Sequence, residues 1–299
     1  MKPADNAFTR EAIEAKGWWG AHRSLVLRRL VQLTVLALCL VGPWFGWWIV
    51  KGNLNYSLTL GTLPLADPLV MLQLLATRHV PERNAIIGVC IVLAFYLLVG
   101  GRVYCAWVCP VNIVTDAASA LRRKLDIRGG GDMPRQTRYW ILALILVLAA
   151  TTGGIVWELV NPVSLLPRGL IFGMGAGWLV IGGIFLFDLF VMKRGWCGHL
   201  CPVGAFYSLL GRWSLVRVSA TKREDCNNCL DCFVACPEQQ VIRMPLKGAS
   251  KGVGPMILDS NCTNCGRCID VCSKDVFTFV PRFAPNEAPT TSAAPQPPQ

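Results

Sequence analysis

Charged side chains are scarce in this sequence, and acidic ones are the scarcer kind. Only 16% of the 299 residues are charged, against about a quarter in a typical soluble domain, whereas 53% are hydrophobic and the mean hydropathy is +0.45. This composition excludes a disordered chain and is not that of a soluble globular protein. The 29 Lys and Arg residues outnumber the 18 Asp and Glu residues. In so apolar a chain, that excess favours the cytoplasmic loops of a membrane protein over a nucleic-acid-binding surface.

Several cofactor signatures are missing as well. The three histidines, His22, His79 and His199, are too few and too scattered for a membrane b-type haem. Without a C-x-x-C-H motif or a G-x-G-x-x-G motif after a strand, we expect neither a c-type haem nor a dinucleotide domain. Cysteine, by contrast, is abundant: there are 14, of which 12 fall in short, repeated spacings. Because secreted disulfide scaffolds are short and polar, ligation of metal clusters is the better interpretation. The other two, Cys39 and Cys90, lie in apolar stretches and are expected to be buried as small hydrophobic residues.

Four apolar stretches each approach the roughly 20 residues with which a helix crosses a bilayer. We therefore predict an α-helical membrane bundle of four transmembrane helices, at Leu30–Val50, Ala85–Gly101, Tyr139–Trp157 and Gly169–Met192. The stretch Leu58–Ala76 is apolar too, but two prolines and an aspartate interrupt it. It is expected to be re-entrant or interfacial.

Basic residues predict the orientation of these spans. From the N-terminus onward, the segments outside the spans hold 6, 3, 7, 1 and 12 Lys and Arg residues. Large and small numbers alternate, and loops rich in basic residues stay in the cytoplasm. A multi-pass protein of the bacterial inner membrane with both termini in the cytoplasm satisfies this rule.

Four regions follow from these patterns. Residues 1–29 form a basic cytoplasmic tail, and residues 30–215 form the membrane domain. Residues 216–283 lack long apolar runs, carry eight cysteines and are predicted to be a small α+β domain. Residues 284–299 are rich in Ala, Pro and Thr and are expected to be a disordered tail.

The membrane domain contains an internal repeat. Residues 102–111 align with residues 194–203 at an offset of 92, and both contain a C-x3-C-P motif. Upstream, Asp67-Pro68 aligns with Asn161-Pro162 at an offset of 94. Two tandem hairpins in the same orientation indicate a pseudo-two-fold axis along the membrane normal.

The C-terminal cysteines carry the most specific signal. Two C-x2-C-x2-C-x3-C runs follow each other, which is the spacing of a bacterial two-cluster ferredoxin, where the fourth cysteine of each run binds the other cluster. The first predicted [4Fe–4S] cluster is therefore bound by Cys226, Cys229, Cys232 and Cys272. The second is bound by Cys262, Cys265, Cys268 and Cys236. Two zinc sites are the alternative, but zinc does not require a third cysteine two residues further on in both runs.

The C-x3-C-P motifs are less specific. In each, two thiols are spaced to lie on one helix face where a span leaves the membrane. In one interpretation they are buried structural cysteines beside a helix-breaking proline. In the other, the four converge as a third redox centre, held by Cys105, Cys109, Cys197 and Cys201. Arg102 and Arg194 would then offset thiolate charge.

Three polar residues lie near the two Asx-Pro steps, at the predicted outer face: Asp67, Glu158 and Asn161. Loop capping is one interpretation of these side chains. Acceptance of protons from a quinol is the other, because polar groups at that depth of a membrane are functional candidates.

The sequence resembles a known family. Its four spans, two C-x3-C-P motifs and double-ferredoxin domain are similar to the membrane ferredoxin-type quinol dehydrogenase subunit of the periplasmic nitrate reductase system, the NapH type. The resemblance covers roughly residues 12–283. Its specific strings are Lys16–Trp19 (KGWW), Gly42–Gly46 (GPWFG), Asn161–Leu166 (NPVSLL) and Gly195–Gly204 (GWCGHLCPVG).

The resemblance implies a function and partners. Electrons would pass from the quinol pool through iron–sulfur clusters toward a periplasmic nitrate reductase, with a periplasmic ferredoxin subunit and a multihaem cytochrome as partners. Two wider relatives share the architecture: a maturation protein of nitrous oxide reductase and a membrane ferredoxin of cytochrome oxidase assembly. The second keeps a role in assembly or copper handling open as an alternative. A docking scaffold is a third possibility, although eight cluster ligands would be superfluous for docking.

Overall fold

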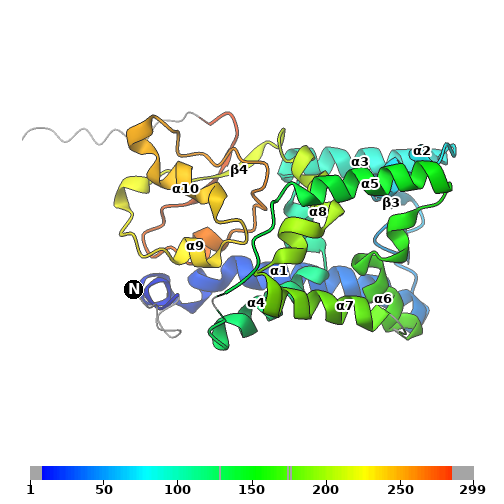
Figure 1. Ribbon diagram of the computed structural model, residues 1–299, viewed down its shortest axis with the longest axis horizontal. Coiled ribbons are helices and arrows are strands. Elements are labelled where there is room, and N and C mark those ends of the chain that lie inside the picture. Colours follow the sequence, from blue (N-terminus) through cyan, green and yellow to red (C-terminus); the bar gives the residue numbers. More distant parts are fainter. Residues whose placement is uncertain (1–8, 128, 174, 176, 285–299) are drawn as a thin grey trace, which may run out of the picture.

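The computed structural model describes residues 9–127, 129–173, 175 and 177–284. They form an elongated molecule with the ferredoxin domain at one end, a helical bundle in the middle and a small β-sheet at the far end (Figure 1). The first eight residues of the basic tail and residues 285–299 of the expected C-terminal tail lie outside the described residues.

Helix α1 (Arg10–Phe45) runs beneath both parts of the molecule (Figure 1). It contains Gly17 with a φ of 74°, which breaks the helical geometry and separates a short leading segment from the long apolar one. It ends at Gly46 in the left-handed conformation, whose N–H bonds to the carbonyl of Gly42. Residues 10–29 of the predicted tail are therefore helical, and this part of the chain packs on α11 (Arg267–Asp270) of the ferredoxin domain.

The predicted spans correspond to helices of unequal length. Helix α1 is long and apolar enough to cross a membrane, whereas the other apolar helices in the described part of the chain have 10 to 17 residues. Among them are α3 (Arg83–Val99) and α5 (Thr137–Thr152). The predicted single helix over Gly169–Met192 is wrong. Helix α6 (Pro162–Phe172) ends at Gly173 with a φ of 85°, and α7 (Gly177–Leu186) continues as the π-helical turn η3 (Phe187–Val191).

A small sheet and two short helices form the far end of the bundle. Strands β1 (Val50–Gly52), β2 (Tyr56–Thr59) and β3 (Leu63–Ala66) pair antiparallel in that order. Helix α2 (Pro68–Ala76) follows directly, and η2 (Val156–Leu159) lies just before α6. The stretch expected to be re-entrant or interfacial is thus two strands and a short helix. Strand β3 packs on α3, where Gly88 leaves room for the β3 backbone.

The repeat is visible element by element. Asp67 and Asn161 each cap a helix, α2 and α6, by accepting the N–H of the residue two positions on, at 2.7 and 3.1 Å. Each C-x3-C-P motif forms a π-helical turn, η1 (Tyr104–Val108) and η4 (Trp196–Leu200), followed by α4 (Val111–Lys124) and α8 (Pro202–Leu210). The two units interlock, because α2 packs on α5 and α6 packs on α1.

The ferredoxin domain is small and largely irregular. Strand β4 (Val216–Ser219) pairs antiparallel with β5 (Thr278–Pro281), which brings the two ends of the domain together. Helix α9 (Asp231–Ala235) contains Cys232 of the first cysteine run, and η5 (Arg223–Asp225) lies just before that run. The segment between the two runs contains α10 (Gln240–Lys247) and η6 (Ala249–Lys251). The apolar side of α10 packs into the domain core around Val241 and Ile242.

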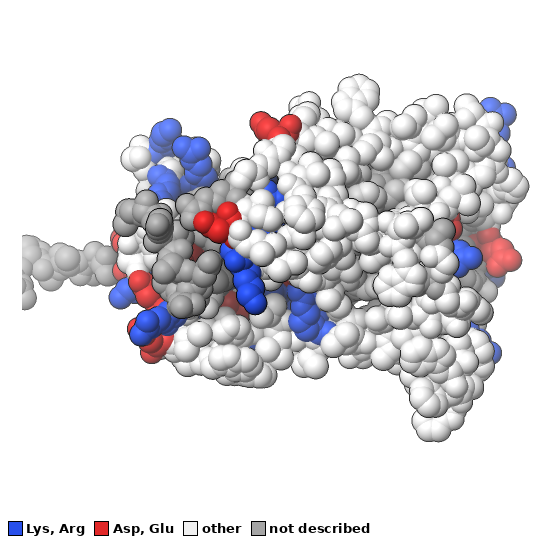
Figure 2. Space-filling view, turned by 60° about the horizontal axis from the view of Figure 1, so that its bottom comes forward, with Lys and Arg blue, Asp and Glu red and all other residues white. Residues whose placement is uncertain are grey.

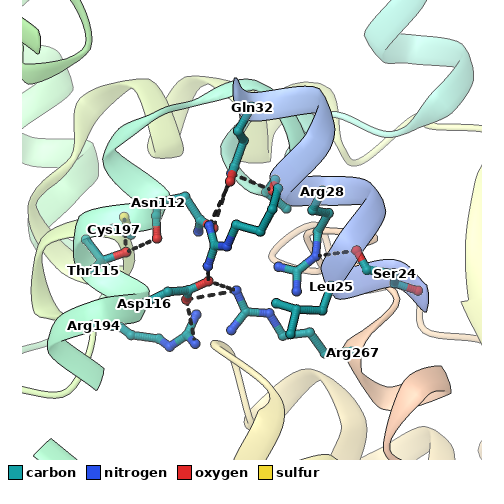
Figure 3. A network of polar contacts seen from close by, with 12 residues as sticks. Ser24, Leu25, Arg28, Gln32, Asn112, Thr115, Asp116, Arg194, Cys197 and Arg267 are labelled. Atoms are coloured by element: carbon teal, nitrogen blue, oxygen red, sulfur yellow. Dashed lines mark hydrogen bonds and ion pairs between the residues drawn. The ribbon is translucent and has the colours of Figure 1, made fainter. Parts of the chain in front are cut away.

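Two buried carboxylates join the domain to the bundle. Asp116, on α4, accepts from Arg194 at 2.9 Å, from Arg267 of the ferredoxin domain at 2.7 Å and from Arg29 of α1 (Figure 3). Burial by itself raises the pKa of Asp116, but Arg194, Arg267 and Arg29 outweigh it and hold that pKa well below its ordinary value.

Glu238 of the ferredoxin domain mirrors this arrangement from the other side. Its Oε1 accepts from Arg102 at 2.7 Å, and both side chains are 2% exposed. Arg138 and Arg135 lie at 3.8 and 3.3 Å from the same carboxylate. Each domain therefore contributes one acid that binds arginine of the other, and two of the six arginines, Arg102 and Arg194, begin the segments that hold the C-x3-C-P motifs.

We expect Asp116→Asn to lower the free energy of unfolding by about 3–5 kcal/mol, the cost of removing one partner of a buried ion pair. The amide keeps the shape but leaves three guanidiniums without a carboxylate. Thermal unfolding of the purified, anaerobically loaded protein measures the change.

Glu14→Gln is the control, because the Arg10–Glu14 pair is exposed at 73% and 66% and should contribute nothing measurable. The Asp116 contribution is present above the ordinary pKa of an Asp, about 4, and is lost as the pH falls below it. An equal unfolding midpoint for Asp116→Asn and the native chain would contradict this role.

Candidate functional site

Four cysteines of the ferredoxin domain share one cavity. Cys226, Cys229 and Cys232 of the first run line it together with Cys272, the last cysteine of the second run. The apolar side chains of Phe233, Leu246 and Phe277 complete its wall. The fold thus brings the last cysteine of the second run to the first three cysteines of the first run.

The remaining four cysteines form a second group, nearer the bundle. Cys236 interacts electrostatically with Cys265 and Cys262, and Cys268 interacts with all three. Here too the cysteine of the first run joins three of the second. Cys265 and Cys268 are buried. The asparagine between the first two cysteines of the second run, Asn264, donates to the carbonyl of Val99 at the end of α3.

The chemistry of both groups suits a cluster of iron and sulfide. Burial and neighbouring thiols raise the pKa of Cys232 to about 12, so without metal charge this thiol keeps its proton. Burial acts in the same direction on Cys265, but Arg267 and Arg28 outweigh it and lower the pKa of Cys265. Iron–sulfur clusters bound by four thiolates are anionic, and buried guanidiniums beside the second group provide the complementary charge.

A single metal ion fits the described residues less well. Among them, no three His, Cys, Asp or Glu side chains are close enough to bind one ion. Tetrahedral zinc holds each sulfur at about 2.3 Å from a common centre. The first group of thiols lines a cavity instead of converging on a point, and a cubane of four irons and four sulfides occupies such a space.

The four C-x3-C-P cysteines lie where the two repeat units meet. Cys109 interacts electrostatically with Cys105 and Cys201, and Cys197 interacts with all three. Cys105, Cys109 and Cys201 pack on the bundle core, and the Cys197 thiol lies 3.9 Å from the Thr115 hydroxyl. The structure therefore gathers these residues, whereas the third redox centre stays a prediction.

The two arginines of the repeat have different partners. The Arg102 guanidinium is hydrogen-bonded to Cys105 and donates to the carbonyl of Cys197 at 3.2 Å, which places positive charge at the thiols. Arg194 interacts electrostatically with Cys197 but forms its ion pair with Asp116.

One small cavity connects the two sets of cysteines. Cys105 and Cys197 of the repeat motifs line it from the bundle side, and Cys265 of the second ferredoxin group lines it from the other. Glu238 and Arg102, the buried ion pair of the interface, line it as well. The C-x3-C-P thiols and the second group thus face each other across a short gap inside the protein.

The predicted outer residues lie together at the opposite end of the bundle. Glu158 accepts from the Asn161 side chain at 3.3 Å and from the Ser164 hydroxyl at 3.1 Å, and Asn55 also donates to it. Asp67 is 7% exposed, and burial raises its pKa to about 6 against the opposing backbone hydrogen bonds of its helix cap.

Sequence reasoning missed the two carboxylates of the interface. Asp116 is the single acid of α4, and Glu238 follows Cys236-Pro237 directly. The scarcity of acidic residues in so basic a chain was the sequence feature that could have indicated these two. It also missed a stack of three buried tyrosines, in which the rings of Tyr104 and Tyr207 are 4.8 Å apart and Tyr96 meets both edge-on.

Two family models match the cysteine-bearing regions. A 4Fe-4S binding domain matches residues 84–128 and again 174–220, one match for each repeat unit. A 4Fe-4S dicluster domain matches residues 225–276, which contain all eight ferredoxin cysteines. The chain is thus an iron–sulfur protein of the ferredoxin type.

Curated relatives cover almost the whole chain. The ferredoxin-type protein NapH of Escherichia coli is 50% identical over 92% of this chain and 95% of its own length. NapH of Haemophilus influenzae is 50% identical over 95% and 98%, respectively. The methylamine utilization ferredoxin-type protein MauN of Methylorubrum extorquens is 52% identical over 92% and 95%. No solved structure matches. The chain belongs to the NapH-type family of ferredoxin-type proteins.

Proposed function

We propose that this chain is a membrane electron-transfer protein that takes electrons from the quinol pool and passes them through iron–sulfur clusters toward a periplasmic nitrate reductase. The observation that carries the proposal is the cavity between the repeat motifs and the ferredoxin domain. Cys105 and Cys197 face Cys265 across it, so the bundle and the ferredoxin domain offer neighbouring redox ligands.

The surface of the bundle supports placement in a membrane. Figure 2 shows Lys, Arg, Asp and Glu gathered toward the two ends of the molecule, with an almost uncharged area between them on this face. On α5, Trp140 is 75% exposed and Val147 58%. A soluble monomer does not expose so large an apolar area. We propose four spans within residues 30–215, built on α1, α3, α5 and α7, with the ferredoxin domain of residues 216–283 in the cytoplasm.

The ligand sets follow the two thiol groups. We assign the first [4Fe–4S] cluster to Cys226, Cys229, Cys232 and Cys272, and the second to Cys262, Cys265, Cys268 and Cys236. When bound, such clusters accept and release single electrons. The second set is the one that faces the bundle, so it is the entry to the ferredoxin domain. Cys229 of the first set is exposed, whereas no cysteine of the first set lines the cavity toward the bundle.

A third centre at the four C-x3-C-P cysteines completes the proposal. Its support is threefold: the mutual interactions of the thiols, the guanidinium of Arg102 beside them, and the 4Fe-4S binding domain that matches both repeat units. Each C-x3-C-P motif ends in a proline at which a new helix begins. The four thiols therefore lie at the inner end of the bundle, before these helices.

The acceptor is assigned by family. The NapH relatives and the resemblance favour a periplasmic nitrate reductase, reached through a periplasmic ferredoxin subunit and a multihaem cytochrome. MauN proteins of methylamine utilization are equally similar, which makes electron transfer in methylamine utilization the second candidate. Both candidates use the same electron path within this chain.

Topology is the first test. Reporter fusions at Gly129 and at the C-terminus should show a cytoplasmic location, and a fusion within residues 53–66 should show a periplasmic one, because basic loops remain inside. Alkaline phosphatase and green fluorescent protein activities measure the two sides. A periplasmic C-terminus would overturn the proposed arrangement.

The crossed ligands give a second prediction. Cys272→Ala should remove the electron paramagnetic resonance signal of the cluster at Cys226, not that of the cluster at Cys262, because Cys272 lines the first cavity. Cys236→Ala is the reciprocal variant and should damage the cluster at Cys262. Loss of the neighbouring cluster in sequence, in either variant, would show that the ligands do not cross.

The third prediction tests the path. In the native protein, duroquinol should reduce the ferredoxin clusters under anaerobic conditions. Cys197→Ser should keep both clusters reducible by dithionite, yet slow their reduction by duroquinol at least about tenfold, because the centre between quinol and clusters is lost. Stopped-flow absorbance and electron paramagnetic resonance monitor the two reductants.

Cys90→Ser is the matched control, since Cys90, which was expected to be buried, is instead an exposed cysteine of α3 outside every motif. It should behave like the native protein. If duroquinol fails to reduce the native clusters, quinol oxidation is wrong and the assembly role becomes the better interpretation. If Cys197→Ser is reduced at the native rate, the third centre is not on the path.

A further inference from the structure

A cavity of about 470 Å³ lies in the bundle on the side away from the ferredoxin domain. Leu38 of α1 and Val92 of α3 line two of its walls, and the β-sheet closes it with Leu65 and Ala66. Its size is in the range of small-molecule sites, and its lining is mainly apolar. Phe95 lines the cavity and is still 51% exposed, so the cavity is accessible from the apolar surface of the bundle.

One carboxylate lines this apolar space. Asp67 belongs to the lining, and its backbone neighbours at the start of α2 donate to it. The other titratable groups that interact with it are Glu158 of η2 and the phenols of Tyr96, Tyr104 and Tyr207. No cation lines the cavity among the described residues, so Asp67 is an acid without an ion-pair partner there.

The repeat shows that capping does not require an acid here. Asn161 occupies the equivalent position, caps α6 through the same hydrogen bond, and carries no charge. The titratable group at Asp67 therefore provides something that the cap does not need. The cavity lies on the Asp67 side alone: its lining includes Asp67 and not Asn161.

The inner end of the cavity lies against the helical turn that holds Cys105. Tyr104 and Val108 line it, and both belong to η1, which also holds Cys105. Tyr104 is close enough to interact electrostatically with both Asp67 and Cys109, so this lining side chain is near the carboxylate and near one thiol. A molecule in this cavity contacts a proton acceptor at one end and lies beside the proposed third centre at the other.

We propose that this cavity binds the head group of a membrane quinol and that the Asp67 carboxylate accepts one of its hydroxyl protons. The inference rests on the quinol oxidation proposed above and locates its site. An aromatic ring with two hydroxyls matches an apolar slot that is open to the bilayer, has one acid and is walled by tyrosines.

The reaction balances with groups already named. Both quinol O–H bonds break, and the quinol becomes a quinone. The two [4Fe–4S] clusters held by the ferredoxin cysteines would take up its two electrons, one each. One proton moves to Asp67 and the other to water at the outer face, where Asp67 also releases its own. The acid must be ionised to accept, so the rate should rise with pH through about 6.

Asp67→Asn tests the acceptor. The variant reproduces the natural Asn161 cap, so α2 keeps its hydrogen bond and the protein should fold. Reduction of the clusters by duroquinol should fall about 100-fold, the usual effect of losing a general base, and its rise with pH should disappear. Binding of a fluorescent hydroxyquinoline N-oxide, which mimics the quinol head group, should change less than threefold.

Leu38→Trp tests the cavity itself, because the larger ring fills it. Hydroxyquinoline N-oxide binding, measured by fluorescence quenching, and duroquinol reduction should both be lost, whereas dithionite still reduces the clusters. Leu33→Trp is the matched control: it places the same side chain on the same helix at a position that is 54% exposed and outside the cavity. It should bind the N-oxide like the native protein.

The outcomes separate this inference from the function on which it rests. If duroquinol does not reduce the native clusters, quinol oxidation itself fails. If it does, and both Asp67→Asn and Leu38→Trp are reduced at the native rate and bind the N-oxide normally, the quinol site is elsewhere. In that case the cavity holds a lipid acyl chain instead.

Discussion

Two buried carboxylates, one from each domain, hold this molecule together. Asp116 of the bundle binds an arginine of the ferredoxin domain, and Glu238 of the ferredoxin domain binds arginines of the bundle. A buried guanidinium without a partner lowers the stability of the fold. Each of the two acids therefore holds three guanidiniums in position. Because Glu238 follows Cys236 by two residues and Arg102 precedes Cys105 by three, this ion pair fixes the distance between the two sets of thiols. The same excess of arginine next to Cys265 complements the charge of an anionic cluster.

The functional groups follow one line along the molecule. The β-sheet lines the apolar cavity that contains Asp67, the C-x3-C-P thiols lie where the repeat units meet, and the ferredoxin cysteines lie beyond them. The repeat explains the thiol group in the middle of the molecule: two equivalent motifs meet there because α2 packs on the second unit and α6 packs on the first. The asymmetry explains the rest. The first unit has an acid, Asp67, at its Asx-Pro step and a β-sheet before it. The second unit has an amide, Asn161, at the equivalent position.

Much of the local structure could be predicted from the sequence. Capping was one of two interpretations of the Asx residues at the Asx-Pro steps, and both side chains do cap a helix start, where they accept one of the first free N–H groups. The segment between the cysteine runs contains three glycines, which by themselves favour a hairpin or a loop, yet Val241 and Ile242 in α10 are buried in the ferredoxin core and stabilise a helix there. The long stretch over Gly169–Met192 was misleading for the opposite reason. Its hydropathy is continuous, but Gly173 with positive φ ends one helix before the next begins.

The sequence by itself determined the cofactor chemistry, the repeat and the family, since these depend on residue types at fixed short spacings that no packing can change. Only the tertiary structure decided which side chains meet. The partners of Asp116 are 87, 78 and 151 residues away along the chain, and Cys265 meets Cys105 and Cys197 across a domain boundary. Such contacts arise when interlocked helices bury their apolar faces and force the few charged groups between them to pair. The composition shows that charged residues are scarce, whereas the fold determines which of them are neighbours.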